Sequence, residues 1–198
     1  MLKKSRNHNL KYGKGCDTDI RVKSTKIPMA CCFMNSTENL KHLPNRTDSM
    51  CFGCSPANPQ GLRLEFFTDG ESIFSWVKVP AHLCGWKNLV HGGVISTILD
   101  EVMGRAVVHK MRCLGMTKSM TVDFLKPITI DKELKAVGKV LEVKNDRECL
   151  AEANIFNEGG ELCAKARGTF AFFKPDHSKK LGIKDEDAME WFNAYMKA

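Results

Sequence analysis

His91, Gly92, Gly93 and Asp100 have the residue types and the spacing to perform acid–base chemistry at a bound carbonyl group. The glycines lack a Cβ, so their backbone can come close to a ligand. Apolar residues recur at helical spacing directly after them, which predicts a helix from about residue 92 to residue 109. The first N–H groups of a helix have no internal partner and suit an oxygen that becomes negative.

Asp100 lies nine residues after His91, about two and a half helical turns further along. It falls away from the centre of the apolar rows of the predicted helix. A carboxylate there is either solvated or enters a second buried surface, where desolvation would make it a better proton acceptor for water. The neighbouring Glu101 points about 100° away around the helix and is expected to be structural.

The elements that must position these groups are one long helix and a set of strands. Alternating residues predict a hairpin from 62–67 and 72–79, and four strands follow the helix at about 115–125, 133–144, 148–157 and 162–173. Turn residues separate the last three strands, which indicates antiparallel pairing. The fold class is therefore α+β, with an antiparallel sheet wrapped around one central helix.

Composition divides the 198 residues into three parts. Residues 1–48 are polar, carry ten Lys or Arg against four Asp or Glu, and are expected to form a basic, disordered leader. Residues 49–175 are expected to form the globular domain, and 176–198 a tail with a short helix. The domain is nearly neutral, which disfavours a nucleic-acid-binding function. The chain has no apolar run of the ~18 residues that a membrane span needs, so no membrane partner is expected.

The nine cysteines do not have the pattern of a disulfide framework, which favours a cytoplasmic location. Cys51 and Cys54 have the spacing of half a metal site, but a structural zinc site takes four ligands. A redox pair is disfavoured because the motif does not open a helix after a strand. The favoured interpretation is two buried cysteines in a packed loop, with no metal and no cofactor.

Three motifs in order resemble the hotdog-fold acyl-CoA thioesterases of the PaaI-like (phenylacetate-pathway) group. They are His91-Gly-Gly followed by Asp100, the segment Cys51-Phe-Gly-Cys-Ser-Pro-Ala-Asn-Pro-Gln-Gly-Leu, and Thr117 with Phe124-Leu-Lys-Pro127. The resemblance covers roughly residues 50–175 and implies a hotdog fold.

The resemblance also implies roles for individual residues. Asp100 would be the general base for water or the nucleophile, and the N–H groups of Gly92 and Gly93 would bind the oxyanion. His91 would orient the thioester, bond across an interface or fix the loop. Thr117 would hydrogen-bond the attacking water or the acid.

The substrate-binding residues are less directly implied. Many relatives have an asparagine six residues before the histidine, where this chain has Gly85. Either Asn88 substitutes for it through a reshaped loop, or this contact that orients the thioester is missing. Trp86 and Met103 are candidates to line the acyl pocket, and both could equally well lie in the core.

The implied function is hydrolysis of a medium-chain or aryl acyl-CoA to the free acid and CoA. In such relatives two subunits share each site, which implies a homodimer and a dimer of dimers, or homotetramer. One alternative is a hotdog module that binds or senses acyl-CoA without hydrolysing it. A hotdog dehydratase or hydratase is the second alternative.

Overall fold

The computed structural model describes residues 39–47, 49–174 and 186–197. In this part of the chain, seven strands form one antiparallel sheet in the order β1-β2-β3-β5-β6-β7-β4. Their bounds are β1 Lys41–Leu43, β2 Phe66–Thr68, β3 Ile73–Lys78, β4 Leu114–Phe124, β5 Glu133–Asn145, β6 Glu148–Phe156 and β7 Leu162–Phe173. A short 3-10 helix, Ala81–Leu83, precedes the central helix α1, Gly92–Met111, and α2 spans Glu186–Lys197.

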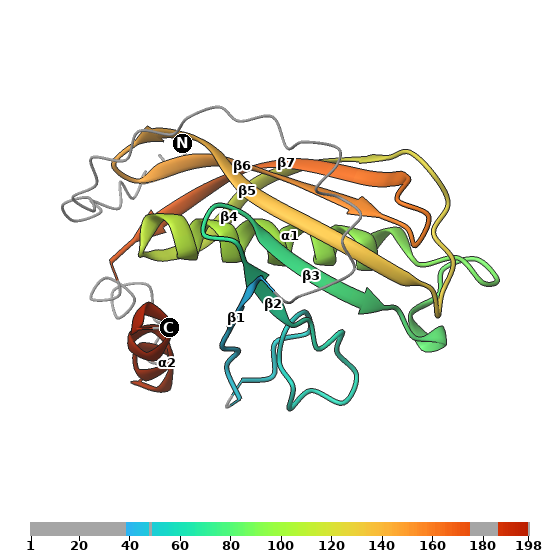
Figure 1. Ribbon diagram of the computed structural model, residues 1–198, viewed down its shortest axis with the longest axis horizontal. Helices are drawn as coiled ribbons and strands as arrows, with labels where there is room; N and C mark the ends of the chain where they lie inside the picture. The colour runs from blue at the N-terminus through green and yellow to red at the C-terminus, as the bar shows by residue number, and fades with distance from the viewer. Residues whose placement is uncertain (1–38, 48, 175–185, 198) are drawn as a thin grey trace, which may run out of the picture.

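Helix α1 lies along one face of the sheet and contacts strands β3 to β7 (Figure 1). Its apolar rows are buried, including Ile98, Leu99 and Val102, because the sheet covers that side of the helix. Gly138 of β5 lets the two layers come close, since a Cβ there would lie 2.7 Å from the Val102 carbonyl oxygen. The predicted α+β class, with a sheet packed around one long helix, is confirmed.

The four strands after α1 fall within one or two residues of their predicted bounds. The first predicted strand does not: only Phe66–Thr68 enters the sheet. The N–H groups of Leu62 and Leu64 donate instead to the carbonyls of Phe52 and Gly53, at 2.9 and 3.0 Å. The segment thus pairs with the Cys-x-x-Cys turn, and Arg63 takes a positive φ of 51° within it.

Strand β1 lies inside the stretch that the composition assigned to the leader. It pairs antiparallel with β2, and Leu43 is 1% exposed in the core. Residues 41–43 therefore belong to the folded unit. Of the expected leader, residues 1–38 and residue 48 lie outside the described residues.

The predicted tail helix is present as α2, and it docks on its own chain. The Trp191 indole N–H donates to the Pro44 carbonyl at 3.1 Å, and Arg112 donates to the Met196 carbonyl at 3.2 Å. Tyr195 is almost fully buried. These contacts join α2 to the end of α1 and to the segment after β1.

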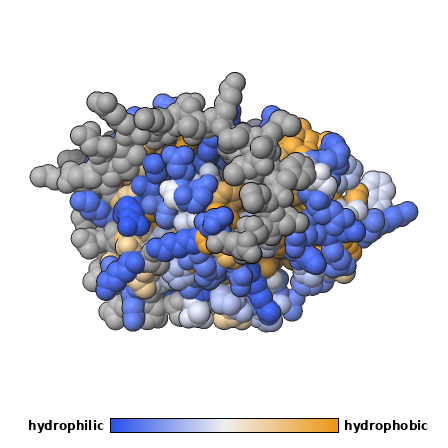
Figure 2. All heavy atoms as spheres, viewed as in Figure 1, coloured by the Kyte–Doolittle hydropathy of each residue, from blue (hydrophilic) through white to orange (hydrophobic). Residues whose placement is uncertain are grey.

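Strand β4 is an edge of the sheet, and most of its residues are exposed. Met116 and Phe124 are large apolar side chains with about half of their surface exposed. Among the coloured residues of the face seen in Figure 2, hydrophilic residues prevail, with hydrophobic patches between them. Among the described residues, no helix is both long and apolar enough to cross a membrane.

Candidate active site

The His-Gly-Gly turn begins α1, and His91 caps it. The His91 backbone is extended, its carbonyl accepts the N–H groups of Val94 and Ile95, and its side chain accepts a third bond. That bond runs from the Gly93 N–H to His91 Nδ1 at 2.9 Å. Side-chain capping of this kind satisfies one of the free donors at a helix start.

Gly92 and Gly93 therefore differ in the space around them and in whether the N–H is used by the helix cap. A Cβ on Gly93 would lie 3.1 Å from His91 Nδ1, so the cap requires a small residue there. A Cβ on Gly92 would make only ordinary contact with Phe124, at 3.5 Å. Since the Gly93 N–H is already bonded to His91, the better candidate for an oxyanion donor is the Gly92 N–H.

Asp100 and Thr117 meet although 17 residues separate them. Thr117 lies on β4, and its hydroxyl donates to Asp100 Oδ1 at 2.7 Å. Asp100 is half-buried on α1, away from the sealed core. Of the two partners expected for Thr117, water and the acid, the structure shows the acid. The bond fixes the Oδ1 oxygen of the carboxylate.

The turn and the acid of one chain lie too far apart to act on one atom. Gly92 and Asp100 are eight residues apart in α1, a rise of about 12 Å at ~1.5 Å per residue. Reacting groups must approach to about 3–3.5 Å. Gly92 and Asp100 therefore belong to the same helix, but within a single chain they do not lie close together.

The loop before α1 carries the two other exposed candidates. Trp86 is 79% exposed, and Asn88 is also exposed. The Asn88 carbonyl accepts the Ile130 N–H at 2.9 Å, which ties the loop to the segment before β5. The Gly85 N–H donates to the Leu89 carbonyl, and a Cβ on Gly85 would lie 3.1 Å from His91 Cα.

Met103 lies in the core. It is completely buried beneath the sheet, and its methyl carbon lies 3.4 Å from a Cβ built on Gly168. Of the two positions that the sequence left open for Met103, the structure shows the core and not the wall of an open pocket.

Glu101 is the polar residue whose environment the sequence did not foresee. The Cys51 thiol donates to its Oε1 at 3.3 Å, and the Cys54 thiol donates to the Cys51 sulfur at 3.5 Å. Burial raises the pKa of Glu101 to about 7. The hydrogen bond from Cys54 lowers the pKa of Cys51 to about 5, and the same bond together with burial raises that of Cys54. The only sequence signal for this cluster was the Cys-x-x-Cys spacing.

Arg105, one turn after Glu101, was also missed. Its guanidinium is buried and donates to the Pro44 carbonyl and to Asn45 Oδ1, at 3.4 and 3.1 Å. It also stacks 4.4 Å from the ring centre of Phe66 and 5.1 Å from that of Trp191. Arg105 therefore joins the segment after β1, β2 and α2 to the central helix.

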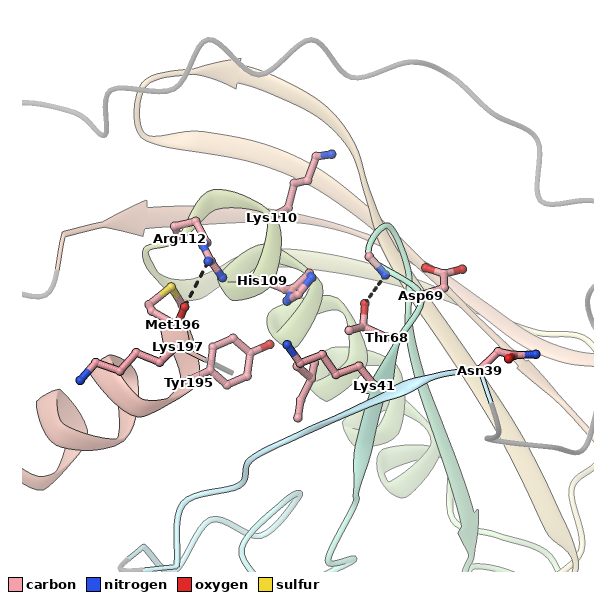
Figure 3. A pocket seen from close by; sticks show the side chains of 12 residues that line it. Asn39, Lys41, Thr68, Asp69, His109, Lys110, Arg112, Tyr195, Met196 and Lys197 are labelled. Carbon is pink, nitrogen blue, oxygen red and sulfur yellow. Dashed lines mark hydrogen bonds between the residues drawn. The ribbon is translucent and has the colours of Figure 1, made fainter.

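A separate pocket of about 780 Å³ lies at the far end of α1 (Figure 3). His109, Tyr195 and Lys41 point toward one another there, from α1, α2 and β1, while the Thr68 hydroxyl of β2 is bonded within its own turn. None of the candidate catalytic residues lines it. His109 is nine residues beyond Asp100 in α1, so this pocket is not the candidate active site.

Comparison with known proteins decides the family of the central region. Residues 87–164, from the loop before α1 into β7, match the family model of the thioesterase superfamily. This region is a thioesterase superfamily domain. It contains the helix, the His-Gly-Gly turn, Asp100 and Thr117, and the predicted recognition is confirmed at that level.

Similar proteins support the assignment of the thioesterase domain. An uncharacterized protein of Schizosaccharomyces pombe is 34% identical over 106 residues, covering 51% of this chain and 60% of that protein. The crystal structure of a thioesterase superfamily protein superposes with a TM-score of 0.57 at 25% identity, over 62% of this chain and 60% of that chain. The matched part thus spans about three fifths of these relatives.

The Escherichia coli PaaI protein from the phenylacetic acid degradation operon shares the fold. The TM-score is 0.51 at 19% identity, over 57% of this chain and 80% of that chain. The hotdog fold predicted from the sequence is therefore confirmed.

Proposed function

We propose that this chain is an acyl-CoA thioesterase of the PaaI-like group, which hydrolyses a medium-chain or aryl acyl-CoA to the free acid and CoA. The observation that carries the proposal is the hydrogen bond from Thr117 to Asp100, placed on the helix that the capped His-Gly-Gly turn begins. Membership of the thioesterase superfamily supports the reaction class. The proposal requires no metal or organic cofactor for this reaction.

In this mechanism Asp100 is the catalytic base. Its free oxygen accepts a proton from water as that water attacks the thioester carbon. The C–S bond of the tetrahedral intermediate then breaks, and the departing thiolate takes the proton from Asp100 and leaves as the CoA thiol. Thr117 is a positioning residue, because its bond to Oδ1 fixes the plane of the carboxylate. The Gly92 N–H stabilises the oxyanion of the tetrahedral intermediate. A single turnover in ¹⁸O-water tests the base role: label found in the Asp100 carboxylate would contradict it, since only a nucleophilic Asp100 forms an anhydride that water can open at the aspartyl carbon.

The separation of about 12 Å between Gly92 and Asp100 supports a site shared by two chains. In a symmetric dimer, the turn of one chain faces the acid of its partner. The exposed edge strand β4, with Met116 and Phe124, supports the burial of this face in a dimer, which we expect to pair into a tetramer. Trp86 and Asn88 would lie beside the acyl-CoA of such a shared site, and the protein would act in the cytoplasm.

Mixing two inactive variants tests the shared site. Gly92→Pro removes the N–H, and proline suits the first helical position after the extended His91. Asp100→Asn removes the base from the other half. Random mixing in a symmetric dimer should restore about one quarter of wild-type activity, because half of the dimers are mixed and each has one intact site. A site contained in one chain would give no recovery.

A binding module without hydrolysis is the second candidate. The occupied Gly93 N–H and the glycine at position 85 favour it, since both remove polar groups that could orient a thioester. Products separate the candidates in a panel of short, medium, long and aryl acyl-CoAs. Hydrolysis releases a free thiol, hydration changes a double bond, and a binding module leaves the ligand unchanged.

A further inference from the structure

Three groups that bind transition metals converge between the segment before β2 and helix α1. The sulfur atoms of Cys51 and Cys54 and a carboxylate oxygen of Glu101 all lie within 4.8 Å of one another. All three residues are half-buried. Cys51 and Glu101 are 50 residues apart, so the fold and not the local sequence assembles the cluster.

The spacing of the donors agrees with the edges of a tetrahedron around zinc. With Zn–S of about 2.3 Å and Zn–O of about 2.1 Å, tetrahedral coordination separates two sulfurs by about 3.8 Å and a sulfur from an oxygen by about 3.6 Å. The two sulfurs lie 3.5 Å apart, and Cys51 Sγ lies 3.3 Å from Glu101 Oε1. These two separations differ from the tetrahedral values by only about 0.3 Å, and the third, between Cys54 and Glu101, lies within 4.8 Å.

The backbone holds the donors in this arrangement. The Ser55 N–H donates to the Cys51 carbonyl at 3.2 Å and closes the turn of the Cys-x-x-Cys segment. The carbonyls of Phe52 and Gly53 accept the N–H groups of Leu62 and Leu64. A Cβ on Gly53 would overlap the Glu101 carboxyl group, so this glycine permits the contact between the turn and the helix.

We propose that Cys51, Cys54 and Glu101 bind one zinc ion, which joins the Cys-x-x-Cys turn to α1 beside Asp100. Two thiolates favour zinc over magnesium or calcium, and three protein ligands leave one position for water. Two thiolates and one carboxylate bring one more negative charge than zinc neutralises, and the Arg105 guanidinium lies one helical turn away to balance it. The proposal replaces the expectation, made from the sequence, that no metal is bound.

Metal binding is tested on the full chain, reduced and freed of metal with a chelator. Zinc is added against a chromophoric competitor, and bound zinc is counted by elemental analysis after desalting. We expect one zinc ion per chain. Cobalt(II) should give thiolate-to-metal charge-transfer absorption, which oxygen and nitrogen ligands alone do not give.

Single variants identify the ligands. Cys51→Ser and Cys54→Ser should each weaken zinc binding by at least about a hundredfold and abolish the charge-transfer band, and Glu101→Gln should weaken binding by about tenfold. The matched control is Cys84→Ser, since Cys84 is an exposed free thiol outside the cluster. It should bind zinc like the wild type.

Two results would overturn the proposal. One is that the reduced wild-type protein binds less than one zinc ion per chain although its thiol groups can still be titrated. The other is full binding in the Cys51→Ser and Cys54→Ser variants, which would place the metal elsewhere. The readout is metal binding and not hydrolysis, so failure here leaves the thioesterase proposal untouched.

Discussion

The close contact between β5 and α1 predicts that replacing Gly138 by alanine destabilises the protein, whereas the same replacement at Gly104 stabilises it. A Cβ on Gly138 would lie 2.7 Å from the Val102 carbonyl oxygen and 3.1 Å from the Met103 nitrogen. Ordinary contact begins at 3.4 Å, so the two layers must separate by about 0.7 Å. Both obstructing atoms are backbone, which means that no side-chain rotation can relieve the clash.

The magnitude follows from two opposing terms. Overpacking costs roughly 1–3 kcal/mol, and alanine restricts the unfolded chain by roughly 0.4–1 kcal/mol. Gly138→Ala should therefore lower the free energy of unfolding by about 1–2 kcal/mol. At roughly 2–4 °C per kcal/mol for a chain of this size, Tm should fall by about 2–8 °C.

Gly104→Ala is the matched control. Gly104 lies inside α1, and the nearest atom to its built Cβ is a Phe170 ring carbon at 3.8 Å. Helix propensity should raise stability by about 0.8–1 kcal/mol and Tm by about 2–4 °C. Calorimetry and urea unfolding measure both variants. A Gly138→Ala protein that melts at or above the wild-type temperature would refute the packing argument.

Three further predictions concern single side chains. Thr117→Val should lower kcat about tenfold with little change in KM, since one positioning hydrogen bond of about 1.4 kcal/mol is lost. A tenfold rise in KM with an unchanged kcat would contradict this role. Burial lowers the pKa of His109, so the unfolded chain binds a proton that the folded chain resists, and stability should fall as pH drops below about 6.5. His109→Asn should flatten that dependence in urea unfolding between about pH 5.5 and about pH 7.5, and an unchanged slope would exclude His109 as its source. The Tyr195 hydroxyl is buried with no partner among the described residues, so Tyr195→Phe should keep or raise Tm, whereas a lower Tm would show that the hydroxyl is bonded.

The long elements could be predicted because their patterns are local. Apolar residues at helical spacing marked α1, and alternating residues with turn signals marked β4 to β7. Strand β1 could not be predicted, because three residues in a basic segment gain their structure only by pairing with β2. The same reason explains residues 62–65, which the Cys-x-x-Cys turn draws away from the sheet.

In the candidate site, too, the contacts within one element could be predicted from the sequence, whereas contacts between distant segments could not. The capped turn and Asp100 belong to one helix, so their spacing in the sequence already relates them. The Thr117 contact followed from the resemblance. The contact between Cys51 and Glu101 did not, because it depends on how the segment before β2 crosses α1. The difference between the Gly92 and Gly93 N–H groups depends on the rotamer of His91, which no spacing specifies.

The most direct test of the account is thiol release from the acyl-CoA panel by wild type, Asp100→Asn and Asp123→Asn. Asp123 is the matched control, an exposed aspartate on the same strand as Thr117 that pairs with Lys165. The account predicts release by the wild type, at least a hundredfold loss in Asp100→Asn with the fold retained, and near-normal turnover in Asp123→Asn. Near-normal turnover in Asp100→Asn would contradict it.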